Sequence, residues 1–324
     1  MRSLKIIAIL LICFMLTGCG QKDGNGGTSE EPNVTNEANN TQDGTNKNPT
    51  VEPTEPVEIN PTATPVPTDN TDIEPSGSVQ PEVSERVGKL DSEVLDKLDN
   101  TTKGWWISLN KEHKTPTIPG DIKDLIDKYD GYYVADTSEK VVYLTFDEGY
   151  ENGYTPMILD TLKENDVKSV FFITSQFLNQ NSDLVQRMLD EGHIIGNHSV
   201  NHPSMPDKDY DGIIKEICGL EDMFAEKFGK GFNYFRPPQG NYSERTLAAT
   251  QQLGYKTIFW SFAYDDWDVT KVRGADYAYN KVMDNLHNGA IYLLHAVSKD
   301  NAEGLDKIIK GIREEGYEIR QLDL

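Results

Sequence analysis

The chain divides sharply at about residue 100, because almost all of its aromatic residues lie beyond that point. Of the 15 Tyr, 11 Phe and 4 Trp, all but Phe14 lie at or after Trp105. Residues 20–100 instead contain 17 acidic and 5 basic residues. A stretch of this composition cannot bury a hydrophobic core. We therefore expect a disordered acidic linker over residues 19–100, followed by a single folded domain.

The N-terminus has the pattern of an export signal. Arg2 and Lys5 precede an apolar run over residues 6–16, which is too short to cross about 30 Å of hydrocarbon as a helix and is typical of a secretory signal. Leu16-Thr17-Gly18-Cys19 resembles the bacterial lipobox, whose cysteine is acylated. We expect a signal peptide over 1–18, a lipid on Cys19 and an extracytoplasmic protein anchored to the outer face of the cell membrane. The alternative is an ordinary cleaved signal with a chance cysteine.

Charge and cysteine content exclude two further properties. The chain has 53 acidic and 31 basic residues, a formal charge of −22, and no basic block. Because nucleic-acid binding depends on neutralising phosphates, no nucleic-acid partner is expected. If Cys13 leaves with the signal and Cys19 carries lipid, Cys218 has no partner for an intramolecular disulfide. A lone cysteine on an apolar helix is expected to be buried.

Beyond Trp105, apolar runs of strand length alternate with helical patterns. The expected strands are 141–145, 169–174, 193–197, 234–236, 257–262, 290–294 and 317–322. The expected helices are 155–164, 182–191, 209–228, 243–253, 275–286 and 302–315. Glycines stand where several of these helices should end, as C-terminal caps do. The alternation predicts a parallel α/β fold, either a barrel or a doubly wound sheet.

The positions of the polar residues separate these two folds. Five expected strands end in polar or aromatic residues that could take part in catalysis, which are Asp147-Glu148, His198 with His202, Arg236, Asp265-Asp266-Trp267 and His295. In a barrel, catalytic groups collect at the carboxyl ends of the strands. A doubly wound sheet concentrates them at one switch point, commonly with a glycine-rich phosphate loop, and we find no such loop. The sequence therefore favours a distorted (β/α)7–8 barrel.

Two histidines and two adjacent acids are candidates for a metal site. His198 and His202 are four residues apart, which lets both imidazoles reach one ion at about 2.0 Å, although two ordinary polar loop residues would give the same pattern. Asp147 and Glu148 directly follow an apolar strand, where burying a charge is costly. Neighbours on a strand point to opposite sides, so one acid can serve as a base and the other as a ligand. A solvated turn is the alternative for this pair.

Together these segments resemble a known family. The five ordered motifs of polysaccharide deacetylases, the NodB homology domain of carbohydrate esterase family four, are similar to Thr145-Phe146-Asp147-Glu148, His198-x-x-x-His202-Pro203, Arg236-Pro237-Pro238-Gln239-Gly240, Asp266-Trp267 and Leu293-Leu294-His295. The resemblance covers residues 138–324, with 101–137 as an N-terminal extension of the domain. It implies an enzyme, a hydrolase that removes the acetyl group from an N-acetylated amino sugar.

The resemblance also implies a metal centre and a general base. His198, His202 and Glu148 would hold a divalent ion, with Zn²⁺ expected first and Co²⁺, Mn²⁺ or Mg²⁺ as alternatives. Asp147 would be the general base. Most of the family has Asp where Glu148 stands, so direct binding to the ion, binding through water and no binding all remain open for this residue.

The remaining roles follow from the same resemblance. His295 would be the general acid, and Asp266 would orient and charge it. Arg236 would pair with the base and keep it ionised. The backbone N–H of Gln239 would stabilise the oxyanion, and the side chain, Tyr in many members, should matter little.

Aromatic residues near the motifs are the expected substrate-binding groups, which are Trp267, Tyr150 and Tyr154. For Trp105 and Trp106, stacking on sugar and packing across the barrel base are both open. The remaining histidines are not expected to take part in catalysis. His193 lies inside an expected strand and should be hydrogen-bonded, whereas His113 and His287 should be surface residues.

Three segments point to one branch of the family. Residues 147–155, 193–199 and 298–303 resemble the branch that deacetylates muramic acid, the delta-lactam-biosynthetic de-N-acetylases. That resemblance implies N-acetylmuramic acid of peptidoglycan as the substrate and muramic δ-lactam formation in the spore cortex during sporulation. An N-acetylglucosamine deacetylase and a decayed glycan-binding module are the alternatives. The expected partners are a peptidoglycan strand and, through the lipid, the membrane, for a monomeric protein.

Overall fold

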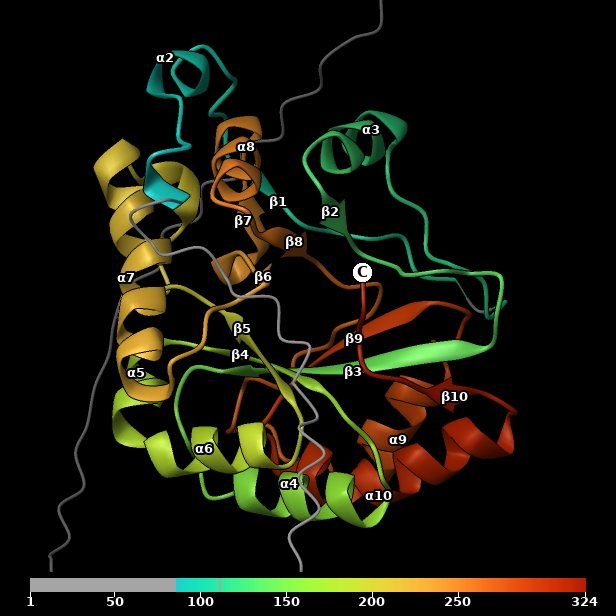
Figure 1. The fold of residues 1–324 in the computed structure, drawn as a ribbon. Coiled ribbons are helices and arrows are strands. Elements are labelled where there is room, and N and C mark those ends of the chain that lie inside the picture. Colours follow the sequence, from blue (N-terminus) through green and yellow to red (C-terminus); the bar gives the residue numbers. More distant parts are fainter. Residues whose placement is uncertain (1–85, 111) are drawn as a thin grey trace, which may run out of the picture. The chain divides into compact units, whose positions relative to one another are not determined.

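The structure is a computed structural model that describes residues 86–110 and 112–324 (Figure 1). The signal peptide predicted over 1–18, the lipid predicted on Cys19 and residues 19–85 of the predicted linker lie outside the described residues. Among the described residues, no helix is both long and apolar enough to cross a membrane.

Helices and strands alternate along the described chain. The helices are α2 (Ser92–Leu95), α3 (Gly120–Lys128), α4 (Thr155–Glu164), α5 (Ser175–Gln180), α6 (Ser182–Asp190), α7 (Tyr210–Phe228), α8 (Glu244–Gln252), α9 (Ala275–Met283) and α10 (Lys299–Glu314). The strands are β1 (Lys103–Gly104), β2 (Gly131–Tyr132), β3 (Val141–Glu148), β4 (Val170–Ile173), β5 (Ile194–Asn197), β6 (Tyr234–Phe235), β7 (Asn241–Tyr242), β8 (Lys256–Ile258), β9 (Ala290–His295) and β10 (Glu318–Ile319). Every strand and helix expected from the sequence overlaps one of these elements.

The strands close into an irregular parallel barrel. β3 pairs with β4 and β9, and β5, β6 and β8 follow β4 in order. Beyond β8 the chain reaches β9, because the Ser261 N–H donates to Ile291 O and the Leu293 N–H donates to Phe262 O, both at 2.9 Å. The short strands β2 and β10 pair with β8 and β3. The prediction of a distorted (β/α)7–8 barrel is confirmed.

Side chains of β3 alternate between two hydrophobic clusters. Val141 and Tyr143 belong to a small cluster that β4, β6, β8 and β9 complete in the barrel interior. The intervening residues, such as Val142 and Phe146, belong to the large cluster between the strands and the surrounding helices. Figure 1 shows α4, α6, α9 and α10 lying together on one side of β3. Because both faces are covered, every residue of β3 is buried, as is usual for parallel strands.

Residues 86–100 fold onto the domain, which corrects the predicted end of the linker. Arg86 forms a buried ion pair with Glu221 of α7 at 3.4 Å, and Leu95 joins the large cluster. β1 then pairs with β7 in antiparallel orientation. The acidic composition did not predict this packing, because only a few side chains of the segment are buried and the residues around them belong to the rest of the domain.

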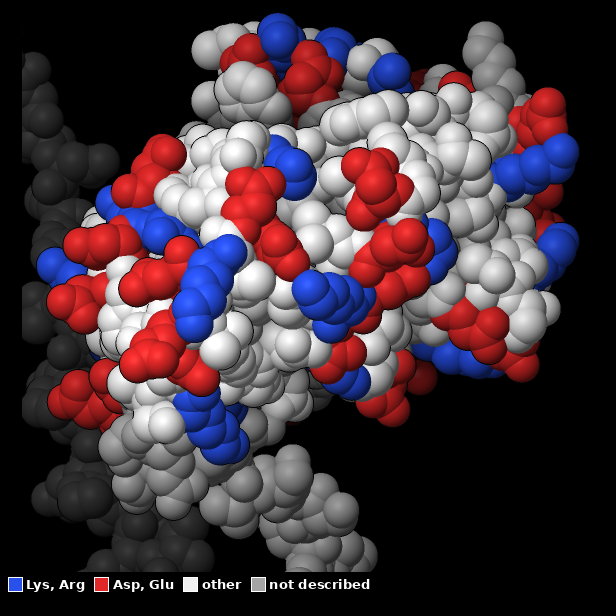
Figure 2. Space-filling model, turned by 90° about the horizontal axis from the view of Figure 1, so that it is seen from above, with Lys and Arg blue, Asp and Glu red and all other residues white. Residues whose placement is uncertain are grey.

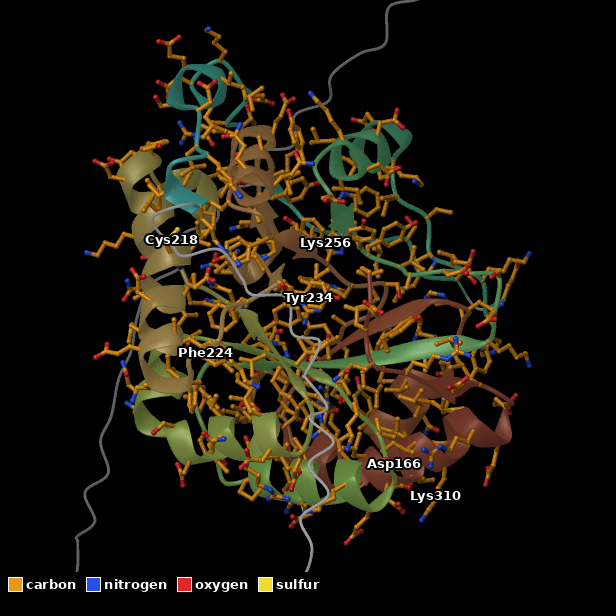
Figure 3. The ribbon with its side chains drawn as sticks, viewed as in Figure 1. Asp166, Cys218, Phe224, Tyr234, Lys256 and Lys310 are labelled. Carbon is orange, nitrogen blue, oxygen red and sulfur yellow. The ribbon has the colours of Figure 1, made fainter. Side chains whose placement is uncertain are left out.

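The structure also tests the structural interpretations of single residues. Cys218 is buried on α7 (Figure 3), as expected. His193 accepts a hydrogen bond from the Ser169 N–H, as expected for a structural histidine, and burial lowers its pKa to about 4. His113 is exposed, as predicted. His287 is buried instead, because it contacts Ser261 Oγ at 3.0 Å where the chain closes the barrel.

Charged side chains of both signs share the surface of the domain. Figure 2 shows Lys and Arg interspersed with Asp and Glu over the face seen from above. Many of them pair, as Arg320 does with Glu139 at 2.7 Å. Exposed pairs of this kind contribute about 0–1 kcal/mol each, so they tune the surface more than they stabilise the fold.

Candidate active site

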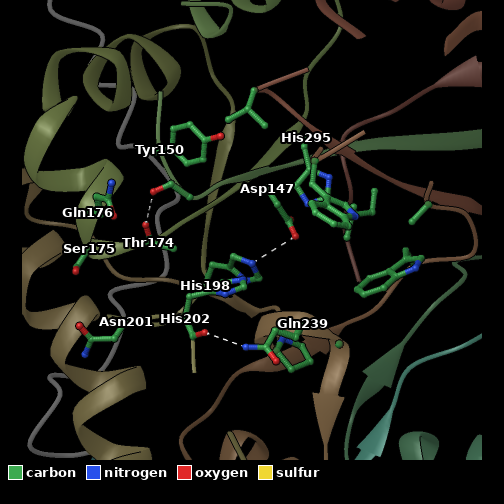
Figure 4. A pocket seen from close by; sticks show the side chains of 18 of the residues that line it. Asp147, Tyr150, Thr174, Ser175, Gln176, His198, Asn201, His202, Gln239 and His295 are labelled. Carbon is green, nitrogen blue, oxygen red and sulfur yellow. Dashed lines mark hydrogen bonds and ion pairs between the residues drawn. The ribbon is translucent and has the colours of Figure 1, made fainter. Parts of the chain in front are cut away.

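A cavity of about 800 Å³ opens at the carboxyl ends of the strands (Figure 4). Its wall includes residues at or just after the carboxyl ends of β3, β5 and β9, among them Asp147, His198, His202 and His295. These side chains come from segments up to about 150 residues apart in the chain. The barrel topology brings them together because parallel strands all end at the same rim.

Asp147 reaches the cavity because it continues the inward-facing set of β3 residues. Its Oδ1 accepts a hydrogen bond from Arg236 Nη1 at 2.7 Å. Burial raises the pKa of Asp147, but Arg236, His198 and His295 together outweigh that effect and leave the pKa below its ordinary value. The carboxylate is therefore ionised at neutral pH, the state in which it can accept a proton.

Arg236 is held rigidly beneath the base. It has no exposed surface, its Nη2 donates to Thr145 Oγ1 at 2.9 Å, and its Nε donates to Ile258 O at 3.1 Å. Its guanidinium lies 4.0 Å from the ring centroid of Phe172. A buried cation with these contacts is matched to one carboxylate, because an unpaired buried charge is strongly destabilising.

His198 and His202 lie on the loop after β5 and face the cavity with their rings 4.7 Å apart, measured between centroids. His198 Nδ1 lies 2.8 Å from Arg236 O. A carbonyl oxygen only accepts, so Nδ1 carries the proton and Nε2 keeps a lone pair. That Nε2 lies 3.4 Å from Asp147 Oδ2. Burial lowers the pKa of His198 to about 4 and also lowers that of His202. Both rings are therefore neutral at pH 7, the state in which an imidazole can bind a metal ion.

The loop that carries the two histidines has an unusual backbone held by α7. Ser199 and His202 both have positive φ, at 69° and 55°. The carboxylate of Glu216 accepts from both the backbone N–H and the side-chain amide of Asn201, at 2.8 and 2.9 Å. This clamp holds the loop in a conformation that non-glycine residues rarely adopt.

His295 is paired with a carboxylate of its own. Its Nδ1 lies 2.8 Å from Asp266 Oδ1, and its backbone N–H donates to Asp266 Oδ2 at 2.8 Å. Burial lowers the pKa of His295, but Asp266 outweighs it and leaves the pKa above its ordinary value. Asp147 and His295 are direct partners in the pairing of β3 with β9. An ionised carboxylate and a proton-carrying imidazole in one cavity can perform general base and general acid catalysis.

Glu148 lies away from the predicted metal site. It alternates with Asp147 on β3, so it faces the helix layer, where Thr155 Oγ1 donates to it at 3.3 Å. Burial, with Glu151 nearby, raises its pKa well above the ordinary value. It does not line the cavity. Of the three possibilities left open for Glu148, this position does not support direct binding to an ion at the two histidines, because strand alternation sends adjacent side chains to opposite faces.

The donor set therefore fits a divalent ion in part. His198 and His202 both line the cavity with neutral rings, and Asp147 Oδ2 lies 3.4 Å from His198 Nε2. Over residues 86–110 and 112–324, no group of three or more His, Cys, Asp or Glu side chains is arranged to hold a metal ion. The two imidazoles fit the predicted role, and Glu148 does not.

Of the residues predicted to stabilise the oxyanion or to bind substrate, three line the cavity and one does not. Gln239 lines the cavity with a backbone φ of 59°, and its Nε2 donates to His202 O at 3.4 Å (Figure 4). Trp267 and Tyr150 also line the cavity, 60% and 41% exposed. Tyr154 does not line it and instead packs against the hydrophobic core, which corrects that prediction.

Several residues of the site have no signal in the sequence. The cavity wall also contains polar residues that the motifs did not indicate, at the N-terminus of α5 and on the loop after β5, which are Thr174, Ser175, Gln176 and Asn201. Trp105 does not line the cavity. It stacks on Phe259 with ring centroids 4.2 Å apart, so packing is its role, whereas Trp106 is 57% exposed.

Comparisons with known proteins agree with this geometry. The family model described as polysaccharide deacetylase matches residues 134–258. The chain belongs to the polysaccharide deacetylase family and is an enzyme of that family. Peptidoglycan-N-acetylmuramic acid deacetylase PdaA of Bacillus subtilis is 44% identical over 229 residues, which cover 70% of this chain and 87% of that protein. The solved structure of PdaA, a family 4 carbohydrate esterase, matches with a TM-score of 0.68 over 69% of this chain and 96% of that one.

Other relatives extend the comparison. A 30.6 kDa protein of Geobacillus stearothermophilus, described as uncharacterized, is 47% identical over 68% of this chain and 83% of its own length. Peptidoglycan-N-acetylglucosamine deacetylase PgdA of Listeria monocytogenes is 33% identical over 57% of this chain and 39% of its own length. The family resemblance seen in the sequence is thus confirmed, and the relatives include deacetylases of both peptidoglycan sugars.

Proposed function

We propose that this protein is a peptidoglycan deacetylase that acts on N-acetylmuramic acid. The observation that carries the proposal is the cavity that holds both Asp147, paired with Arg236, and His295, paired with Asp266. The 44% identity to the Bacillus subtilis muramic acid deacetylase, over 87% of that protein, supports the choice of sugar. The overall reaction adds water across the acetamide C–N bond and yields acetate and a free sugar amine.

His198 and His202 are the proposed metal-binding residues. A bound divalent ion, Zn²⁺ or alternatively Co²⁺, Mn²⁺ or Mg²⁺, supplies a Lewis acid that polarises a carbonyl and acidifies a water molecule. The neutral state of both imidazoles supports this assignment. The hydrogen bond from His198 Nδ1 to Arg236 O orients the ring in the way that second partners of ligand histidines commonly do.

The chain's own residues move the protons. Asp147 accepts the proton of the attacking water, with its ionised state maintained by Arg236. His295 donates its Nε2 proton to the nitrogen as the C–N bond breaks, because an amide nitrogen leaves poorly without a proton. Each step of this kind contributes about 10²–10⁴ in rate. The backbone N–H of Gln239 is the proposed donor to the developing oxyanion, worth about 2.7–4 kcal/mol in comparable sites.

Aromatic side chains at the cavity are the proposed sugar contacts. Trp267 presents an exposed ring at the wall, and Tyr150 lies on the loop that follows the base. Rings in such positions can cover one face of a sugar and exclude water from the reacting acetamide. The muramic substrate then implies δ-lactam formation in the spore cortex and expression during sporulation.

The cellular setting is part of the proposal. Lipid attachment at Cys19 would hold the protein at the outer face of the cell membrane, and the acidic, proline-containing segment before residue 86 would act as a spacer toward wall glycan. The domain is proposed to act as a monomer. Labelling cells with a radioactive fatty acid tests the anchor, because Cys19→Ala should abolish incorporation into this protein.

One assay separates the candidate functions. Purified peptidoglycan is incubated with the enzyme in a metal-containing buffer, acetate is measured, and the released sugars are analysed by mass spectrometry. Loss of one acetyl group from muramic residues supports the proposal, and loss from glucosamine residues supports the alternative substrate. Binding without acetate release would instead indicate a glycan-binding module.

A further inference from the structure

Asn301 lies beside the proposed acid and has no role among the residues described so far. It belongs to the first turn of α10 and is completely buried. Its side-chain Nδ2 donates to Asp266 Oδ2 at 2.6 Å and to His295 O at 3.2 Å. One amide group thus contacts both the acid and the carboxylate that orients it.

The Asp266 carboxylate and the His295 carbonyl set the orientation of this amide, and Tyr264 bonds its other end. The Tyr264 hydroxyl donates to Asn301 Oδ1 at 2.5 Å, so the oxygen faces Tyr264 and the NH₂ group faces Asp266. The reverse orientation would place the Asn301 oxygen against two acceptors, the Asp266 carboxylate and the His295 carbonyl, which no hydrogen bond could satisfy. Tyr264 comes from the loop after β8 and lines the cavity, so the amide is clamped between the cavity wall and the acid pair.

The Asp266 carboxylate therefore has three hydrogen-bond partners, two of them on one oxygen. Its Oδ1 faces the His295 ring nitrogen, and its Oδ2 receives the His295 N–H and the Asn301 amide. The neighbouring residue Asp300 receives the backbone N–H groups of Arg273 and Gly274 at 2.8 and 2.9 Å. The first turn of α10 therefore holds both ends of the loop that begins near Asp266 and ends at Gly274.

We propose that Asn301, locked by Tyr264, is a positioning residue that aims the His295 imidazole at the departing nitrogen by fixing the Asp266 carboxylate. The inference rests on the function proposed above, because it assigns a residue to the acid step of that reaction. A carboxylate that loses one donor in a buried site is free to rotate, and the ring bonded to it rotates as well. Geometry errors of about 1 Å at a catalytic group can lower rates by about 10².

A comparison of leaving groups tests this role directly. Deacetylation of glycan releases an amine, which needs the proton of His295, whereas 4-nitrophenyl acetate releases 4-nitrophenolate, which departs without one. Asn301→Ala should lower kcat for acetate release from peptidoglycan by at least about tenfold, with ester hydrolysis within about twofold of wild type. Tyr264→Phe should act in the same direction with a smaller effect, because it removes only the lock on the amide.

A matched control is available at Asn165, the residue that ends α4. Asn165 also bonds α10 through its side-chain amide, which donates to Asp306 Oδ1 at 3.1 Å, and it does not line the cavity. Asn165→Ala should change neither rate. Equal losses of glycan and ester hydrolysis in Asn301→Ala, or no loss in either, would overturn the proposal.

A second measurement does not depend on glycan turnover. Solvent exchange of the His295 Nδ1 proton, followed by NMR, should be faster in Asn301→Ala than in wild type and Asn165→Ala. An unchanged exchange rate would argue against a positioning role of Asn301 even if no activity could be detected in any assay. A wild-type enzyme that releases no acetate from peptidoglycan would refute the proposed function instead, and the exchange measurement would still decide the role of Asn301.

Discussion

Gly240 follows the proposed oxyanion donor, and its replacement by alanine should be costly for two separate reasons. Its φ is 67°, and an added Cβ would lie 2.9 Å from the Trp260 ring and 3.1 Å from Trp105 Cβ. A non-glycine residue in the left-handed region costs roughly 1–2 kcal/mol, and overpacking adds about 1–3 kcal/mol. Trp105 cannot retreat easily, because its indole N–H donates to Trp260 O at 3.0 Å. Gly240→Ala should therefore lower the free energy of unfolding by about 2–5 kcal/mol.

Gly229 provides the matched control for this prediction. It ends α7 with a φ of 63°, and a Cβ there would meet nothing within 4 Å. Gly229→Ala should thus lose only the backbone part, about 1–2 kcal/mol. Denaturant unfolding of both variants measures the difference, and equal losses would refute the packing argument. Because Gln239 immediately precedes Gly240, kcat of Gly240→Ala should also fall more than its KM changes, whereas Gly229→Ala should keep wild-type kinetics.

Three further predictions concern the proposed chemistry. Asp147→Asn should lower kcat by at least about 10², because it removes the base, and should also lower the melting temperature, because it leaves the buried Arg236 guanidinium without its counter-charge; near wild-type turnover would show that another group is the base. Asp266→Asn should move the high-pH limb of the pH–rate profile to lower pH, because Asp266 holds the pKa of His295 above its ordinary value and His295 must be protonated to act as an acid; a limb that does not move would assign it to another group. Glu216→Ala should lower metal retention during dialysis against a chelator by about 10–100-fold, because Glu216 holds the loop that carries His198 and His202. Glu148→Gln should leave metal content unchanged, and a larger loss of metal in this variant than in Glu216→Ala would show that Glu148 is a ligand.

The sequence predicted the core of the barrel because its strands are long enough to be read from apolar runs. The run at 141–145 is an example, since every residue of β3 is buried. The pairing of β1 with β7 could not be predicted in this way. β1 and β7 contain two residues each, and β1 follows an acidic segment that resembles a linker by composition. Their stability comes from tertiary contacts, such as the hydrogen bond from the Trp105 N–H to Gly240 O at 2.8 Å.

The site residues could be predicted where a motif marks the end of a strand. The prediction failed where the choice between two adjacent residues decides which side chain faces the cavity. The motif at 147–148 does not say which acid points inward. The structure answers this through the inward-facing set that contains Val141 and Tyr143, which puts Asp147 at the cavity and Glu148 against α4. Asn301 lies in the segment 298–303 that resembles one branch of the family, but the sequence assigned it no role, because its contacts form only when the loop around Asp266 is folded over it.

The pairing of β3 with β9 creates an electrostatic problem that the site solves with two separate partners. Asp147 and His295 are neighbours in register, and in isolation they would compete for one proton. Arg236 instead lowers the pKa of the aspartate, and Asp266 raises that of the histidine. The pKa values of the two groups are displaced in opposite directions, so the base is ionised and the acid is protonated at the same pH. Removing either partner should therefore impair both proton transfers, because Asp147 and His295 also act on each other's charge.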